Sequence, residues 1–142
     1  MVASAEPTSD GKGLTGRKHR YPWGAEPPTP ARANLDTRVL GCAAEAAFPA
    51  GESAFGCRQM AGNVWEWTAS AFYPFPGYLV DYPYREYSAP WFGSRNVRKG
   101  GAWATRARLA YNTYRNFFPP ARNAVYARFR TCAREEYGMR TA

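Results

Sequence analysis

The sequence predicts an irregular α+β domain with short strands, long loops and little regular secondary structure. Three observations lead to this prediction. The chain has 13 glycines and 12 prolines among 142 residues, so its apolar clusters are short and frequently interrupted. No window shows an apolar stripe of helical period and helical length. Three short runs instead alternate between two kinds of side chain, which is the pattern of half-buried strands.

The chain begins with two segments of unlike composition. Residues 1–20 carry few apolar side chains and are rich in Gly, Ser, Thr and Lys, so we expect a flexible lead. Residues 21–30, YPWGAEPPTP, set four prolines around a Trp-Gly turn, which excludes both helix and central strand. This second segment is expected to form an ordered loop held by its aromatic residues. The main domain is expected over 21–134, with a tail over 135–142.

Three runs are the expected strands. NVWEWTA places Val64, Glu66 and Thr68 on one face and puts both tryptophans on the other. NVRKGGAWAT repeats the strand theme with two glycines, Gly100 and Gly101, that permit a close backbone approach or a bulge. VYARFRTCA is the third alternating run, and the side chains of its Tyr and Arg residues share a face. No run suggests an internal repeat.

Length, charge and cysteine count exclude several classes of protein. A chain of 142 residues is long enough for one domain with a core. The net charge of +8 comes almost entirely from arginines scattered singly through aromatic sequence, so nucleic acid is not an expected partner. Three cysteines without a C-x-x-C pair make neither a disulfide framework nor a zinc site. No apolar run has membrane-spanning length, so we expect a cytoplasmic protein with no membrane partner.

Glu66 lies between two tryptophans, directly after a Gly-Asn step. Two interpretations of this carboxylate stay open on pattern alone. It is either a solvent-facing glutamate on a half-buried strand, or a ligand for a hard cation such as calcium, together with the carbonyl oxygens of the preceding turn. Alternation by itself does not name a metal.

Six stretches together carry a family resemblance: YPWG (21–24), ANLD (33–36), FPAGESAFGCRQMAGNVWEWTAS (48–70), KGGAWAT (99–105), YRNFF (114–118) and FRTCA (129–133). In order and spacing the chain resembles, over roughly 20–134, the formylglycine-generating-enzyme-like or sulfatase-modifying-factor domain. The resemblance implies an irregular C-type-lectin-like fold. It also implies a calcium ion held by the side chains of Gln59 and Glu66 and by the backbone oxygens of Gly62 and Val64.

The founding activity of that family is not expected here. It oxidises a substrate cysteine to formylglycine with two cysteines that bind copper. Carried over onto this chain, their positions are Thr105 and Ala110. Neither side chain offers the thiolate that a soft cuprous ion needs.

Residues 73–93, joined to the stretch from Lys99 to Arg122, resemble the sulfoxide synthases of ergothioneine biosynthesis and the related selenoneine synthases. These enzymes use non-heme Fe(II) and dioxygen to join cysteine or γ-glutamylcysteine, or a selenium donor, to hercynine. In that family the lectin-like domain contacts substrate and supplies a tyrosine near the iron. Three histidines of a separate N-terminal helical domain hold the iron itself.

The resemblance also implies which side chains form the site. Asn116, Phe117 and Phe118 match the pocket wall that contacts hercynine, where aromatic rings suit its trimethylammonium group and an amide suits its carboxylate. Two arginines are candidates for pairing with substrate carboxylates, and the proton-donating tyrosine falls within 76–87. These candidates are Arg115 and Arg122, and Tyr78 with the alternatives Tyr82, Tyr84 and Tyr87.

One count limits the chemistry of the chain. His19 is its single histidine, whereas oxygen activation at such a centre needs two or three imidazole ligands. We therefore expect a C-terminal fragment that is inactive alone and that needs the iron-binding helical domain as its partner. The alternatives are a non-catalytic C-type-lectin-like binding module and a gene remnant that does not fold.

Overall fold

The structure, a computed structural model, describes residues 3–87 and 89–131. Its regular elements are short, and the helical ones are single 3-10 turns. In chain order they are β1 (Ala5–Pro7), β2 (Leu14–Lys18), η1 (Pro49–Gly51), β3 (Trp65–Ala71), η2 (Arg85–Tyr87), η3 (Ala89–Trp91), β4 (Asn96–Lys99), η4 (Ala107–Leu109), β5 (Asn116–Phe118) and β6 (Ala127–Arg128). Turns and loops connect them, so the predicted class of short strands and long loops is confirmed.

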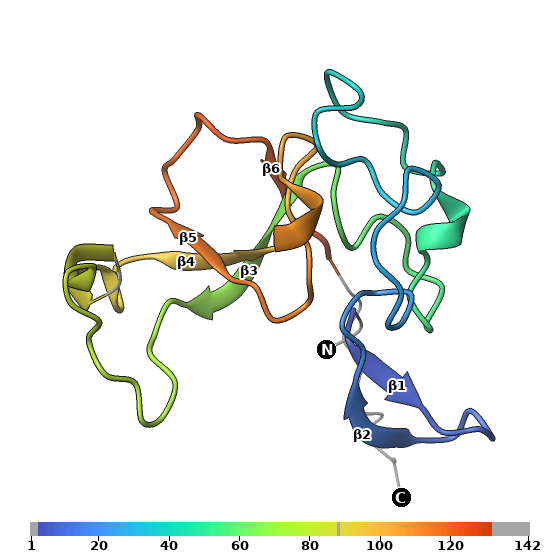
Figure 1. Cartoon of the computed structure of the whole chain (residues 1–142), viewed down its shortest axis with the longest axis horizontal. Helices are drawn as coiled ribbons and strands as arrows, with labels where there is room; N and C mark the ends of the chain where they lie inside the picture. Colours follow the sequence, from blue (N-terminus) through green and yellow to red (C-terminus); the bar gives the residue numbers. More distant parts are fainter. Residues whose placement is uncertain (1–2, 88, 132–142) are drawn as a thin grey trace, which may run out of the picture.

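A four-stranded sheet in the order β5-β4-β3-β6 occupies the left and middle part of the view in Figure 1, beside the long loops. β4 runs antiparallel to both β3 and β5, whereas β6 runs parallel to β3. Three of these strands lie within or largely overlap the runs predicted from alternation. The fourth strand, β5, lies in the RNFF stretch, whose alternation was not recognised in the sequence.

The register gives the sheet two chemically different faces. Directly paired residues share a face, and Trp67 is paired with Arg98, which is in turn paired with Asn116. Side chains alternate along each strand, so the neighbouring residues point the opposite way. The tryptophan face carries Trp65, Trp67, Arg98, Asn116 and Phe118. The glutamate face carries Glu66, Val97, Lys99, Phe117 and Arg128.

The N-terminal segment differs from its expected flexible form. β1 and β2 pair antiparallel as a hairpin, which lies apart from the sheet in Figure 1. The Asn112 side chain anchors it, because its Nδ2 donates to the carbonyl oxygens of Ala3 at 2.6 Å and His19 at 3.0 Å. The polar composition of this segment correctly predicts the exposed surface of β2. Composition does not predict the hydrogen bonds from Asn112, which lies far along the chain and orders the backbone.

A buried polar network holds the long loops against the start of β3. Asn63 is buried with a φ of 65°, and its Nδ2 donates to Gln59 Oε1 and to the carbonyl of Ala43. Its Oδ1 accepts the Ala43 backbone N–H at 2.7 Å. Side-chain amides thus satisfy backbone groups that have no strand partner.

Two local predictions are confirmed by the structure. Tyr21 and Trp23 stack at 5.6 Å and Trp23 Nε1 donates to the Glu26 carbonyl, which gives the ordered loop expected at 21–30. Gly100 has a φ of 87°, and a Cβ there would lie 2.7 Å from the Met60 carbonyl oxygen. The expected close backbone approach is therefore present.

Candidate functional site

The tryptophan face encloses a guanidinium group. Arg98 is fully buried, and its Cζ lies 4.8 Å from the ring centre of Trp67 and 4.1 Å from that of Phe118. The ring of Trp65 is 5.8 Å away. None of the three guanidinium nitrogens has a hydrogen-bond partner among the described residues. We call Arg98 and these three rings the arginine cage.

Electrostatics at the cage disfavour the charged form of its arginine. Burial is the main cause, and the nearby charge of Arg122 adds to it, so that the pKa of Arg98 is lowered to about 10. Arg122 itself is exposed, and its Cζ lies 5.4 Å from the centre of the Phe118 ring. One half-buried ring therefore contacts two guanidinium groups.

The side of the sheet that carries Phe117 is covered by an aromatic cluster. Phe117 stacks on Phe72 at 4.0 Å, and Phe72 contacts Phe92 at 5.2 Å. Tyr78 meets Phe92 edge to face at 5.6 Å. Arg115 caps the cluster, with its Cζ 5.2 Å from the Phe72 ring centre, and burial lowers the pKa of its guanidinium.

The site residues expected from the sequence thus fall into two groups. Tyr78, Phe117 and Arg115 meet in the aromatic cluster, whereas Asn116, Phe118 and Arg122 lie on the side of the arginine cage. Asn116 Oδ1 accepts the backbone N–H of Phe117 at 2.8 Å, which fixes the amide at the sheet surface. The three alternative tyrosines remain apart from both groups on the exposed loop: Tyr82, Tyr84 and Tyr87.

Glu66 is buried and held by two arginines from the end of the described chain. Arg130 Nε donates to both carboxylate oxygens, at 2.6 and 2.7 Å. Arg128 Nη2 donates to Glu66 Oε1 at 3.0 Å. Both arginines also donate to the backbone carbonyl of Gln59. The carboxylate is therefore neutralised within the chain.

These contacts fit the implied calcium ion poorly. Both oxygens of Glu66 already accept hydrogen bonds from guanidinium groups, and Gln59 Oε1 accepts one from Asn63. Two positive charges occupy the position beside the carboxylate where a divalent cation would have to bind. Calcium at Gln59, Gly62, Val64 and Glu66 stays a prediction that the observed geometry opposes.

Calcium is expected to leave the melting temperature of the chain unchanged, to within about 1 °C. A cation bound only to the folded state at a hundred times its dissociation constant stabilises by about 2.7 kcal/mol, which is a shift of several degrees. The measurement is a thermal melt in millimolar calcium against the same buffer with a chelator. A rise of several degrees that magnesium does not reproduce would restore the calcium site.

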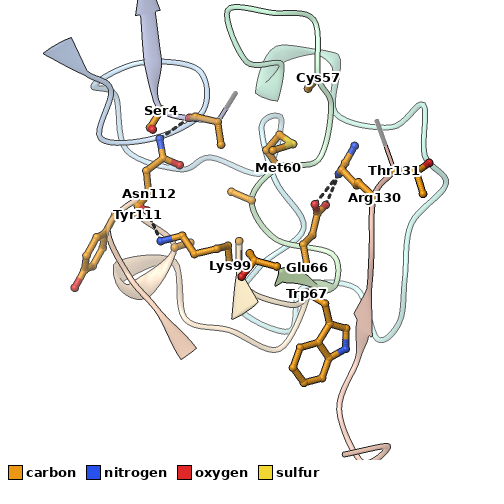
Figure 2. Close-up of a pocket in the computed structure, with 15 residues that line it drawn as sticks. Ser4, Cys57, Met60, Glu66, Trp67, Lys99, Tyr111, Asn112, Arg130 and Thr131 are labelled. Carbon is orange, nitrogen blue, oxygen red and sulfur yellow. Dashed lines mark hydrogen bonds and ion pairs between the residues drawn. The ribbon is translucent and has the colours of Figure 1, made fainter. Parts of the chain in front are cut away.

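A cavity of about 370 Å³ opens beside Glu66 (Figure 2). Met60, Trp67 and Lys99 line it together with the Glu66–Arg130 pair. Lys99 Nζ donates to the carbonyls of Asn112 at 2.6 Å and Tyr114 at 2.8 Å, and burial lowers its pKa. None of the expected substrate-binding residues lines this cavity. It was not predicted, because its walls come from segments that are far apart in the sequence.

Metal ligands are scarce in the part of the chain that the structure describes. No group of three His, Cys, Asp or Glu side chains gathers there in a way that could hold a metal ion. Thr105 Oγ1 accepts the backbone N–H of Ala102, and Ala110 is buried, so the two positions matched to the copper cysteines have structural roles. Within 3–87 and 89–131, the residues therefore do not fit an iron or a copper centre. No described helix has the length and apolar character needed to cross a membrane.

The irregular sheet, the long loops and the lack of helices longer than one turn in the described ranges agree with the fold expected for a domain of the sulfatase-modifying-factor type. The family model for the sulfatase-modifying factor enzyme 1-like domain matches residues 6–136, and the chain belongs to this family. The match takes in most of the segment that the sequence suggested was a separate lead, and it extends to the first residues of the expected tail. Residues 132–142 lie outside the described residues.

Within this family, the chain is similar to three curated proteins that share one name. The chain is 45% identical over 114 residues to a protein named hercynine oxygenase from Mycobacterium tuberculosis. It is 44% identical over 118 residues to one from Mycolicibacterium thermoresistibile, and 38% identical over 119 residues to one from Mycolicibacterium smegmatis. Each match covers 80% of this chain but only 26–28% of the relative. The chain thus spans about a quarter of the length of these proteins.

Proposed function

We propose that this chain is the substrate-binding, lectin-like part of a non-heme iron sulfoxide synthase of ergothioneine or selenoneine biosynthesis. The reaction joins a cysteine-type thiol, or a selenium donor, to hercynine with dioxygen. The observation that carries the proposal is the 38–45% identity to three hercynine oxygenases over 80% of the chain. The arrangement of the expected side chains supports it, because Asn116, Phe117 and Phe118 form a strand of the sheet and Tyr78 is in ring contact with the cluster that contains Phe117.

Iron, when bound, supplies the activation of dioxygen, and a chain with one histidine does not provide a set of histidine ligands for it. The single histidine, His19, belongs to the loop after β2, with its Nε2 3.7 Å from Glu6. The iron must therefore be held by another domain or subunit, as the resemblance to the sulfoxide synthases implies. We infer that the chain is inactive alone.

The roles left to this chain are binding, orientation and proton transfer. The amide of Asn116, fixed by its own backbone, can orient a substrate at the sheet surface. Tyr78 is the candidate proton donor, because it is the one of the four tyrosines in ring contact with the cluster that contains Phe117. Aromatic packing restricts its ring, and this makes the position of the hydroxyl reproducible.

A chimera tests the proposed function directly. The part of the Mycobacterium tuberculosis hercynine oxygenase that matches this chain is replaced by residues 1–142, and the purified protein is supplied with Fe(II), oxygen, hercynine and each thiol donor. Sulfoxide product, followed by mass spectrometry, is expected. A chimera that binds hercynine but forms no product would favour the binding-module alternative. A chimera that does not melt cooperatively would favour the gene remnant.

The Tyr78→Phe variant of the same chimera is expected to lose at least about a hundredfold in turnover, the scale of a missing proton donor. The KM for hercynine is expected to change less than twofold, because the ring contacts remain. Tyr84→Phe serves as the matched control, since Tyr84 contacts Tyr87 rather than the cluster. An equal loss in both variants would remove the assignment to Tyr78.

A further inference from the structure

Among the residues that the structure describes, Arg98 is a buried cation without an anionic partner. It is fully buried, and its three guanidinium nitrogens find no acceptor among the described residues. Contact with the faces of three aromatic rings offsets part of the desolvation cost. Rings offer no lone pairs, however, so the directional hydrogen bonds of the guanidinium stay unmade. A group that could accept them would be strongly attracted to this position.

A second arginine reinforces the positive charge. Arg122 lies over the ring of Phe118, which also covers Arg98, and its charge is felt at Arg98. No ion pair joins either arginine to a carboxylate in the described ranges, whereas Arg58, Arg128 and Arg130 each have one. Two guanidinium groups thus meet at one ring, and neither has a carboxylate partner among the described residues.

The position of this pair connects it with the substrate. Arg98 is the direct cross-strand partner of Asn116 in β5, so both side chains lie on the tryptophan face. Phe118 is two residues along the same strand and shares that face. Asn116 and Phe118 are two of the three residues that the sequence assigned to the hercynine wall.

We infer that Arg98 and Arg122 form the carboxylate-binding subsite for an amino-acid substrate, with the ring of Phe118 as its movable cover. This inference rests on the proposed function. Guanidinium groups bind carboxylates through paired, charge-assisted hydrogen bonds, and such bonds satisfy the nitrogens that the cage leaves without acceptors. Hercynine and the cysteine-type donor both carry this group, so either can occupy the subsite.

The inference fixes the orientation of the ligand. The ring of Phe118 already contacts two positive groups, and a trimethylammonium group brought to it would meet their repulsion. The carboxylate end of hercynine therefore points to the tryptophan face, and its ammonium end points away from it. This reverses the role of Phe118 expected from the sequence, where its ring contacted the ammonium group.

Access to Arg98 requires a side-chain movement. Phe118 and Trp67 are half-buried, and exposed or partly exposed side chains change rotamer on fast timescales. Displacing the Phe118 ring opens the cage between the two arginines. Because Trp65 and Trp67 form the rest of the cage, carboxylate binding should change tryptophan fluorescence.

The test measures binding to the full 142-residue chain by calorimetry and tryptophan fluorescence. Four ligands form two pairs that differ only by the carboxylate: hercynine with its decarboxylated amine, and cysteine with cysteamine. Carboxylate ligands are expected to bind at least about tenfold more tightly than their partners. The pair that shows the preference identifies which substrate occupies the subsite. Glycine betaine against choline extends the test to a carboxylate that is not a substrate.

Variants separate this subsite from a structural role. Arg98→Met fills the cage without a charge, so it is expected to melt at or above the temperature of the parent and to lose the carboxylate preference to within about twofold. Arg122→Gln is expected to weaken the preference partially. Arg108→Gln, at an exposed arginine of η4, is the matched control and should leave it unchanged.

Each outcome supports or overturns the inference. Hercynine binding without any carboxylate preference, or a preference that survives in Arg98→Met, overturns the subsite and leaves the proposed function standing. Betaine binding that depends on Arg98, with no hercynine binding and an inactive chimera, supports the subsite and overturns the proposed function. If no carboxylate binds the parent chain, the subsite is overturned and the chimera alone decides the function.

Discussion

Glu66→Ala is expected to lower the free energy of unfolding by about 2–3 kcal/mol. The carboxylate neutralises Arg128 and Arg130, whose side chains are only 26% and 30% exposed. Removing one partner of a largely buried pair leaves uncompensated charge, which typically costs 3–5 kcal/mol in a dry site and less where water reaches the arginines. The same change frees β6 from its side-chain tie to β3. Urea unfolding followed by tryptophan fluorescence measures the loss.

The matched control is a second Arg–Glu pair in the described part of the chain. Glu52 accepts from Arg58 Nε, and both side chains are more than a third exposed. Glu52→Ala is therefore expected to cost less than about 1 kcal/mol. Equal losses in the two variants would mean that the charge cluster at Glu66 adds nothing beyond an ordinary surface pair, and that its burial is not what holds β6.

The pairing of Glu66 with two arginines shows what the sequence could and could not predict. Alternation in the run over 125–133 correctly places Arg128 and Arg130 on one side of the chain. Alternation in the run NVWEWTA likewise places Glu66 on the opposite face from Trp65 and Trp67. Neither pattern contains the parallel register that sets β6 beside β3, because register depends on contacts between strands more than 50 residues apart. Pattern alone left Glu66 either solvent-facing or a calcium ligand, and family resemblance implied calcium. The structure instead buries Glu66 and pairs it with two guanidinium groups.

The candidate site has the same limit. Family resemblance placed Asn116, Phe117 and Phe118 in one pocket wall, but a strand points successive side chains to opposite faces. Because β5 was not recognised as a strand, the sequence did not indicate that Phe117 lies on the opposite face from Asn116 and Phe118. Arg98 was not singled out either, although the run NVRKGG placed it opposite Val97. Alternation in this run already indicated the face of Arg98. Only the pairing of Arg98 with Trp67 of β3 shows that this face is the aromatic one.

Gly62→Ala is expected to destabilise the chain by about 3 kcal/mol. Gly62 has a φ of 77°, which costs a residue with a Cβ about 1 kcal/mol. A Cβ there would also lie 2.5 Å from the carbonyl oxygen of Asn34, which accepts the Asn63 backbone N–H at 2.9 Å. Forcing these backbones apart adds about 1–3 kcal/mol. Because Asn63 organises the loops around Ala43, the loss should reach beyond the substituted turn.

Gly77→Ala separates the cost of the backbone conformation from the cost of the steric clash. Gly77 has a φ of 80°, close to that of Gly62, but no neighbouring atom lies within 4 Å of the position of its Cβ. Backbone conformation alone acts there, so a loss of about 1 kcal/mol is expected. The difference between the two variants in urea unfolding then measures the close approach of the Gly-Asn turn to Asn34. Equal losses would show that the loop around Asn34 relaxes freely, and that the turn before Glu66 does not fix the register of β3 against the long loops.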